Sequence, residues 1–271
     1  MKTKKKLALL PAALLLLALL LTACGNQTNF RVNAAVTLVE QEYSLAFRND
    51  DPLRDYVVAA IETLNAEGRV EELSRKWLGR NAIEFGKDAE ALSKLEEPEA
   101  HTLLVGVDIN SFPMAYMQEG NYWGFDVELA SVVCSRLGWT LKVLPIEKEN
   151  VYIELYSGNI DVAWGGIALD QKEIDARKYT QYGPYIENDI VIISRDGSRI
   201  TGSASLKRRN LAMPTTPEAT AALETQPKLM EKLGQITRLP GGTTECFAAL
   251  YAGECDAVLT DSTAMMYFNS H

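Results

Sequence analysis

The sequence predicts an α/β protein with two lobes, and three features of the chain lead to that prediction. From residue 103 onward, strand-like and helix-like stretches alternate, which is typical of βαβ units and a parallel sheet. A second series of the same kind begins near residue 210. Segments 157–163 and 252–258 share the order small, glycine, any, any, aspartate, apolar, apolar, so each marks a helix end running into a strand.

Each series divides into elements that can be justified from its residues. Helix 127–137 carries Val127, Ala130, Val133 and Leu137 on one face and ends at Gly138. In the first series we expect the other elements to be a helix at 151–156 and strands at 103–107, 140–145, 160–164 and 189–194. In the second series we expect strands at 210–213, 235–239 and 256–260 and helices at 218–233, 244–251 and 263–269.

Two amphipathic helices are predicted before the first series. Pro52 begins one whose apolar face ends near Gly68, and a second short helix follows it. The apolar positions of the pair are Leu53, Val57, Ile61, Leu64, Val70, Leu73 and Trp77. Residues 80–101 are polar and acidic, with one weakly amphipathic turn, and we interpret them as a linker.

Composition and charge exclude several classes of protein. The 271 residues are 47% hydrophobic and 23% charged, which indicates a globular chain rather than a disordered one. The formal net charge is −9, and four lysines lie among the first six residues, so the remaining chain is still more acidic. A nucleic-acid partner is therefore not expected.

The first 23 residues have the layout of an export signal. A basic start is followed by an apolar run of about fifteen residues, which is short for a membrane-spanning helix. Leu21-Thr22-Ala23-Cys24 resembles the lipobox of bacterial lipoproteins, which implies that Cys24 is lipidated and that residues 24–29 form a tether. An uncleaved anchor helix is the alternative. In either case we expect an extracytoplasmic protein attached to the membrane.

Cysteine and histidine usage points to neither a metal site nor nucleophilic catalysis. Apart from Cys24, the three cysteines Cys134, Cys246 and Cys255 are an odd number without zinc-ligand spacing. A disulfide between Cys246 and Cys255 and two buried thiols both remain open. The only histidines are His101 and His271, so no Ser-His-Asp constellation is expected, and no cofactor is implied.

Several short motifs occur in an order that characterises one family. They are the segments 104–108, 112–113, 124–129, 157–161, 183–185 and 256–262. In this order the chain resembles the extracellular solute-binding proteins, family 3, of amino-acid ABC transporters. The resemblance implies a two-lobed periplasmic-binding-protein-like (type II) fold, with a hinge that we place at residues 192–196 and 42–46.

The order of one motif departs from the family pattern. The family's closing strand and helix pair matches residues 43–48, 51–55 and 76–79, near the start of this chain rather than after residue 271. We interpret this as a circular permutation, in which residues 80–101 join the old ends. Lobe 1 would then comprise 42–79 and 102–193, and lobe 2 would comprise 30–41 and 194–271.

The resemblance also implies where a ligand binds. Asp261 matches the residue that receives a ligand ammonium group, and Asp108 ends the first strand of lobe 1, although a helix cap or surface role is an alternative for both. The family's carboxylate clamp has lost its hydroxyl at Ala168, and its Arg position falls on Lys172 or Glu173. The full implied set is Asp108, Ser111, Tyr116, Trp164, Gly166, Ala168, Lys172, Glu173, Thr215, Thr216 and Asp261. Trp164 is either an aromatic wall of the site or a core strand residue.

The depleted anion donors and the remaining carboxylates favour a ligand rich in positive charge. We therefore expect a monomeric, non-catalytic receptor that captures an amino acid or a related amine-bearing molecule and delivers it to an ABC permease. An enzyme on the same scaffold, a lyase or dehydratase, is the competing class, with unpaired Glu173 as its only hint. A ligand-sensing lipoprotein shares every feature of the receptor.

Overall fold

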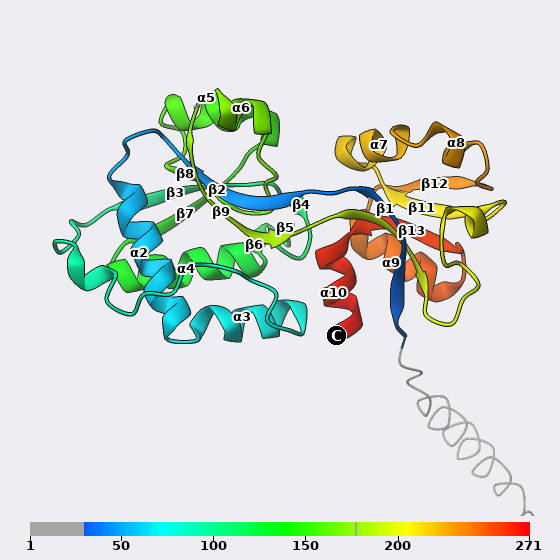
Figure 1. Ribbon diagram of the computed structural model, residues 1–271, viewed down its shortest axis with the longest axis horizontal. Helices are drawn as coiled ribbons and strands as arrows, with labels where there is room; N and C mark the ends of the chain where they lie inside the picture. Colours follow the sequence, from blue (N-terminus) through cyan, green and yellow to red (C-terminus); the bar gives the residue numbers. More distant parts are fainter. Residues whose placement is uncertain (1–29, 177) are drawn as a thin grey trace, which may run out of the picture. The chain divides into compact units, whose positions relative to one another are not determined.

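The computed structural model describes residues 30–176 and 178–271. Residues 32–271 form one compact unit that contains two five-stranded sheets, one in each lobe. The strand orders are β7-β3-β8-β2-β9 in the first lobe and β1-β10-β13-β11-β12 in the second (Figure 1). The chain is therefore two-lobed α/β, as the sequence predicts.

The first lobe combines its sheet with two long helices, α2 and α4, that lie near each other. Its main strands are β2 (Glu42–Phe47), β3 (Thr102–Val107), β7 (Thr140–Pro145), β8 (Val162–Ala163) and β9 (Thr180–Glu187). Its helices are α2 (Leu53–Ala66), α3 (Arg69–Leu78), α4 (Phe125–Leu137), α5 (Val151–Tyr156) and α6 (Gln171–Asp175), with short 3-10 turns η1 (Leu92–Lys94) and η2 (Lys148–Asn150). A small sheet is formed by β4 (Asn110–Ser111), β5 (Ala115–Gln118) and β6 (Asn121–Trp123).

The second lobe has the same kind of architecture. Its strands are β1 (Val32–Val39), β10 (Ile190–Arg195), β11 (Leu211–Pro214), β12 (Ile236–Leu239) and β13 (Ala257–Asp261). Its helices are α7 (Pro217–Glu224), α8 (Pro227–Met230), α9 (Gly242–Ala252) and α10 (Ser262–Ser270), with the 3-10 turn η3 (Ser203–Leu206). The single helix predicted at 218–233 is broken in two at Pro227, which cannot donate the backbone hydrogen bond that a continuous helix needs.

Both sheets are mixed rather than purely parallel. Strands β3, β7 and β8 pair in parallel, as do β11, β12 and β13. The remaining pairs, β1 with β10, β10 with β13, β2 with β8 and β2 with β9, are antiparallel. Alternation of strand and helix predicts the parallel half, but it does not predict β9, which precedes β10 without a helix between them.

The N-terminal helices pack on the first lobe. The apolar face predicted for residues 53–77 joins the same buried cluster as the core of β3 and α4, with Val57 and Ile61 completely buried. Burial of such side chains stabilises the fold by roughly 1.5–3 kcal/mol each before entropy costs. This face is consequently integral to the first lobe.

Residues 80–101 are packed against the lobe and are not a free polar linker. Phe85 is buried between Tyr182 and Tyr185, stacked on both rings. Asn65 Nδ2 donates to the carbonyl oxygen of Phe85 at 2.9 Å, and Glu84 N donates to the carbonyl oxygen of Tyr185 at 2.8 Å. The polar and acidic composition of the segment predicts a linker, but it does not predict that Ile83, Phe85 and Ala91 are buried.

The chain crosses between the sheets twice, at residues 40–41 and 188–189 (Figure 1). The hinge expected at 192–196 and 42–46 is displaced from these crossings, because 192–195 lie inside β10 and 42–46 lie inside β2. The ladders on both sides leave only residues 40–41 and 188–189 outside the strands, and these are the positions able to absorb a dihedral change.

Candidate functional site

Asp108 follows β3 directly and lies at the end of that strand, as the sequence predicts. Its backbone N–H donates to the carbonyl oxygen of Gly165 at 3.0 Å, which fixes the turn. One carboxylate oxygen accepts from the backbone and side-chain amides of Asn110 at 2.9 and 3.1 Å. The pKa of Asp108 is raised, chiefly because the half-buried carboxyl loses hydration. Asp108 therefore combines a local turn role with a position on the wall of a cavity.

Asp261 ends β13 in the second lobe and has the same kind of environment. Burial raises the pKa of its carboxyl to about 8, and the nearby charges of Glu218 and Asp108 add to that shift. Asn188 and Lys148 act in the opposite direction. The charge of Asp108, in the first lobe, thus contributes to the raised pKa of Asp261 in the second.

Glu218 and Lys148 join this group, although neither is in the predicted site. Lys148 Nζ, on η2 of the first lobe, is 2.5 Å from Glu218 Oε1 at the N-terminus of α7 in the second lobe. Around them lies a cavity of about 360 Å³ that Asp108, Asn110 and Thr216 also line. The sequence offered one indication for Glu218, because an acidic residue in the first turn of a predicted helix lies at its positive end. Lys148 lies in no motif.

Tyr43 is a buried phenol on which the charges of the same three carboxylates act. Its side chain is buried, and its hydroxyl accepts a hydrogen bond from Asn188 Nδ2 at 2.6 Å. Burial raises the pKa of Tyr43 well above its usual value, and the charges of Asp261, Glu218 and Asp108 raise it further. The motif around Tyr43 identified a strand, but nothing in the sequence indicated which face of that strand meets the carboxylates.

The loop after β8 holds Gly166 and Ala168. Gly166 has φ +66° and is buried, and a Cβ there would lie 2.1 Å from the Cβ of Ser111. Ser111 is itself buried, and its hydroxyl donates to the carbonyl oxygen of Gly166 at 2.8 Å. Ala168 pairs with Tyr43 but lines a different cavity, of about 600 Å³, with Ser44 and residues 40–42.

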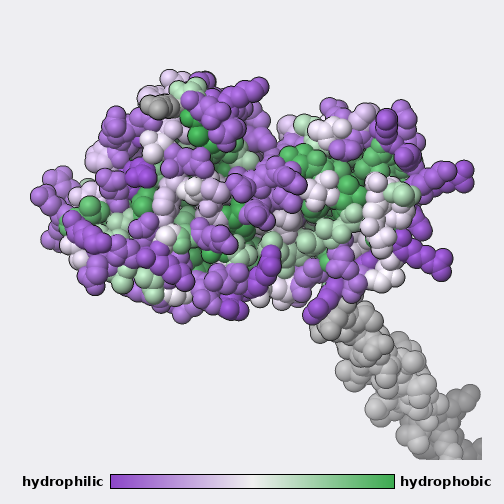
Figure 2. Space-filling model, in the orientation of Figure 1, coloured by the Kyte–Doolittle hydropathy of each residue, from purple (hydrophilic) through white to green (hydrophobic). Residues whose placement is uncertain are grey.

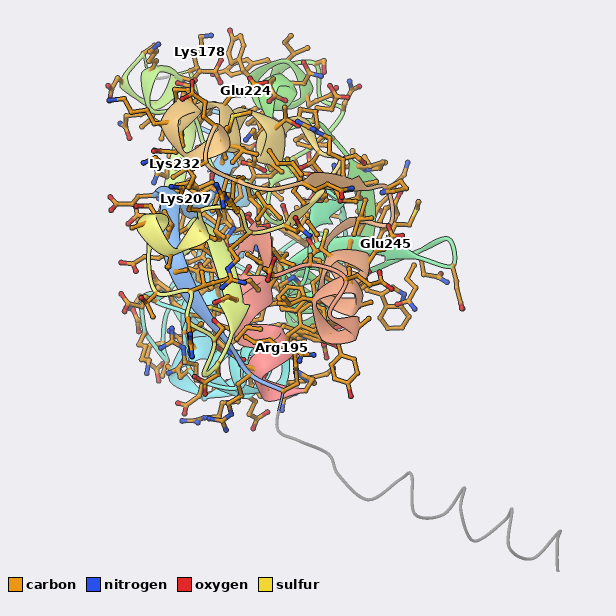
Figure 3. The ribbon with its side chains drawn as sticks, turned by 90° about the vertical axis from the view of Figure 1, so that its right-hand side faces the viewer. Lys178, Arg195, Lys207, Glu224, Lys232 and Glu245 are labelled. Atoms are coloured by element: carbon orange, nitrogen blue, oxygen red, sulfur yellow. The ribbon has the colours of Figure 1, made fainter. Side chains whose placement is uncertain are left out.

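The two residues at the family's Arg position do not line the described cavities. Lys172 is exposed on α6, whereas Glu173 is half-buried and paired with Lys178 at 3.0 Å. Asp170 caps the helix by accepting from the backbone N–H of both. Lys178 lies on the upper edge of the molecule in Figure 3. The partner on Glu173 weakens the one hint of an unpaired catalytic carboxylate.

The aromatic and threonine candidates lie in different surroundings. Trp164 is completely buried in the core of the first lobe, so its placement is that of a core strand residue. Tyr116 is half-buried, with its ring 4.9 Å from that of Phe112, and it lines a third cavity of about 300 Å³ together with Thr216. Thr216 caps α7 by accepting from Ala219 N at 3.2 Å, while Thr215 is exposed.

The three thiols in the described part of the chain are free. Cys134 and Cys246 are buried and Cys255 is half-buried, and burial raises the pKa of each, to about 12 for Cys246. Within residues 30–176 and 178–271, no cluster of His, Cys, Asp or Glu has a metal-binding arrangement. No helix in that same part is long and apolar enough to span a membrane. Cys24 lies outside the described residues.

A family model decides the relationship of the chain. The model described as "Bacterial extracellular solute-binding proteins, family 3" matches residues 103–241, which is more than half of the sequence. The chain belongs to this family. The members of this family are extracytoplasmic solute-binding proteins rather than enzymes. The two sheets described above confirm the two-lobed prediction.

Other members of the family align over part of the chain. A probable amino-acid-binding protein of Bacillus subtilis (strain 168), YxeM, is 27% identical over 112 residues, which is 41% of this chain and 42% of that protein. The match thus spans less than half of the curated relative.

Solved structures match over a larger part of the chain. A polar amino acid ABC uptake transporter substrate binding protein from Streptococcus thermophilus has a TM-score of 0.45 and 24% identity, over 59% of this chain and 61% of that one. An ABC uptake transporter substrate binding protein from Streptococcus pneumoniae with bound histidine has a TM-score of 0.46 and 24% identity, over 62% and 68%.

Proposed function

We propose that this member of the family captures an amino acid or a related amine-bearing molecule between its lobes and delivers it to an ABC importer. The observation that carries the proposal is that Asp108, Glu218 and Lys148, from both lobes, line one cavity, with Lys148 and Glu218 paired across it. The charges of Glu218 and Asp108 also act on Asp261, whose pKa they help to raise. A ligand ammonium group would relieve the repulsion among these carboxylates.

The ligand class follows from what the site contains and what it has lost. Position 168 is alanine, the two candidates for the Arg position line none of the described cavities, and the hydroxyl of Thr216 is engaged in capping α7. A second carboxylate on the ligand would meet acidic side chains without a guanidinium partner, at a cost of several kcal/mol. The site therefore favours neutral or cationic amines over acidic amino acids. The name of the Bacillus subtilis relative supports an amino acid as the core of the ligand.

We further propose that Cys24 is lipidated and anchors the protein to the cell membrane. The basic start, apolar run and Leu21-Thr22-Ala23-Cys24 order support this. An anchored receptor would remain close to its permease partner, which raises the local concentration of ligand-loaded protein there.

We also propose that the chain is a circular permutant of the family's usual order. The side chain of Asn269, on α10, accepts from Val32 N and donates to Val32 O, both at 2.9 Å, where β1 begins. A connection from α10 into β1 would thus be short, which supports a family order in which β1 follows α10. In the same view, the two lobes are 30–41 with 188–271 and 42–79 with 102–187, and the packed segment 80–101 is the new connection. The lobe boundary lies a few residues before the expected 193/194, because β10 (Ile190–Arg195) pairs with β1 and β13 of the second lobe.

Isothermal titration of the mature protein with L-arginine, L-lysine, L-glutamine, L-glutamate, L-aspartate and putrescine tests the proposed ligand class. We expect binding of at least one neutral or cationic amine and loss of that binding in Asp261→Ala. Asp196→Ala, at an exposed carboxylate of the second lobe that bonds Asn33, is the matched control. Tight binding of aspartate or glutamate, or unchanged binding by Asp261→Ala, would contradict the proposal.

A further inference from the structure

Asp126 is a buried carboxylate that has no part in the ligand contacts proposed above. It is the second residue of α4 and is 1% exposed. Its Oδ2 accepts from the backbone N–H of Gly166 at 3.0 Å. The hydroxyl of Tyr185 donates to the same carboxylate and lies 2.8 Å from both oxygens. One side chain on α4 thus holds a loop and a strand that lie 40 and 59 residues further along the chain.

The loop that Asp126 holds supports the cleft residues of the first lobe. The carbonyl oxygen of Gly165 accepts from Asp108 N, and the carbonyl oxygen of Gly166 accepts from the Ser111 hydroxyl. Since Gly166 has no room for a Cβ against Ser111, the loop and the turn at Asp108 fit together in one arrangement. A displacement of the Gly166 amide would therefore shift the loop that holds Asp108 and Ser111 by hydrogen bonds.

The strand that Asp126 holds leads into an inter-lobe crossing. Tyr185 lies in β9, three residues before Asn188, whose side chain contacts Tyr43 and Thr263. Tyr185 is 1% exposed and stacks on Phe85, so its ring has little freedom to move independently of the strand. The Asp126 carboxylate consequently connects the loop at 165–168 to β9, the strand that leads into the crossing at 188–189.

We propose that Asp126 is a positioning residue of the ligand site: its carboxylate ties the loop at 165–168 to β9 and so fixes the cleft side of the first lobe. This inference rests on the proposed function for its effect on ligand binding. The hydrogen bonds of Asp126 with Gly166 and Tyr185 do not depend on any ligand, since they are present in the protein alone. Protonation of the carboxylate or its replacement by an amide removes an acceptor from Gly166 or Tyr185 and loosens the loop.

The tie should respond to pH near neutrality. Burial raises the pKa of Asp126 to about 7, against the opposing hydrogen bonds of Tyr185 and Gly166 and the nearby Trp164 indole. The titratable group that faces it from β9 is Tyr185, with Tyr43 of β2 behind; burial raises the pKa of both phenols, so neither ionises in this range. No other charged side chain of the described residues contributes to its pKa. The carboxylate form therefore prevails above neutrality and the protonated form below it.

Selective labelling of glycine tests the tie directly. The sequence has two Gly-Gly pairs, 165–166 and 241–242, so labelling with ¹³C-carbonyl, ¹⁵N-glycine selects the amides of Gly166 and Gly242 in a spectrum of the full chain. We expect the Gly166 resonance to titrate with a midpoint near 7 and to be static over this range in Asp126→Asn. Gly242, in the second lobe, is the internal control.

Two further variants keep the test decisive. Asp161→Asn alters another buried carboxylate of the first lobe, one that bonds Leu104 and Arg48, and should leave the Gly166 titration intact. Tyr185→Phe keeps the Asp126 carboxylate but removes a donor to its ionised form, so the midpoint of the Gly166 titration should move to higher pH. This variant tests the proposal if Asp126→Asn fails to fold. A Gly166 resonance that does not titrate, or that titrates equally in Asp126→Asn, overturns the proposal.

The consequence for binding is measured with L-arginine and L-glutamine as probes. If only the carboxylate form holds the loop, affinity should rise about tenfold between pH 6 and pH 8, because the competent fraction rises by about that factor. Asp261 titrates in the same window, so the part due to Asp126 is the slope lost in Asp126→Asn. If affinity changes with pH by the same factor in the unaltered protein and in Asp126→Asn, the positioning role is contradicted. If the unaltered protein binds neither probe, the proposed function is contradicted instead, and the Gly166 titration alone tests whether Asp126 holds the loop.

Discussion

The backbone N–H of Asn188 donates to the carbonyl oxygen of Gln41 at 2.8 Å, and this bond joins the two segments that cross between the lobes. The Asn188 side chain extends the connection. Its Nδ2 donates to Tyr43 in the first lobe, and its Oδ1 accepts from the N–H and hydroxyl of Thr263 in the second. One fully buried amide thus links elements from both lobes beside the candidate site.

Asn188→Ala should destabilise the protein by about 1–3 kcal/mol, because it leaves the buried Tyr43 and Thr263 hydroxyls without their partner. Urea denaturation measures the change. Asn33→Ala is the matched control, since the Asn33 amide bonds Asp196 at an exposed position and should cost little. Equal effects of the two substitutions would show that the crossing bonds add no stability.

The unliganded protein should lose stability as pH rises from about 4 to about 8. Burial raises the pKa of Asp126 to about 7 and that of Asp261 to about 8, from an ordinary value of 3.8. Between those limits the folded state retains protons that the unfolded state has released, so folding is favoured at the acidic end. The denaturation midpoint at several pH values checks this, and Asp261→Asn should flatten the slope. If the denaturation midpoint changes with pH equally in Asp261→Asn and in the unaltered protein, the raised pKa of Asp261 is contradicted.

Glu218→Gln should lower the pKa of Asp261, since Glu218 is the largest of the charges that raise it. For a cationic amine the same change should weaken binding by removing a carboxylate from the cleft. Titration calorimetry in buffers of different ionisation enthalpy reports both the affinity and the protons released. Glu224→Gln, at an exposed position on the same helix, serves as control (Figure 3). An unchanged affinity and proton release would remove Glu218 from the site.

Mass spectrometry of the mature protein from its native host should find a lipid-modified Cys24 at the N-terminus. Cys24→Ser should release the protein from the membrane fraction, because both the attachment atom and the processing site are lost. Unmodified Cys24 on otherwise mature protein would refute the anchor. Cys255→Ser, at a thiol in the second lobe, should leave membrane attachment unaffected.

A re-ordered chain that runs from residue 102 to 271 and then continues through a short linker into 30–79 should fold and retain ligand affinity. The Asn269–Val32 contact places the new junction across a short distance, and leaving out residues 80–101 removes the packing of Phe85. We therefore expect lower stability with similar affinity. Failure of this chain to fold, when the original order folds, would weigh against permutation.

Local pattern predicts the elements of this fold better than it predicts the site. Helix and strand periodicity locates α4, α5 and β7 to within two residues, because their apolar side chains face a core. Strand β9 is missed because its burial does not alternate regularly and cis Pro184 interrupts the pattern. Two residues, Asp108 and Asp261, are recoverable because each directly follows or ends a strand. Lys148 and Tyr43 reach the site through tertiary packing, which leaves no local signature.

Hydrophilic and apolar residues are distributed unevenly over the visible surfaces of the two lobes. Figure 2 shows hydrophilic side chains over most of the visible first lobe, while apolar colour is more prominent on the second. The exposed large apolar residues include Met117 and Trp123 of the small sheet and Tyr251 of α9. Single exposed apolar side chains are normal on a monomer, so they do not by themselves mark a docking face.

The paired crossings also determine how the chain can reach its native state. Tyr43 and Asn188 are 145 residues apart, and β1 pairs with β10 over a similar separation. Strands β1 and β2 come early in the chain, but the partners that complete both sheets come more than a hundred residues later. Contacts of such high order are entropically costly to form first. Folding should therefore be slow, because the first sheet cannot be complete before β9 is available and the second cannot be complete before β13.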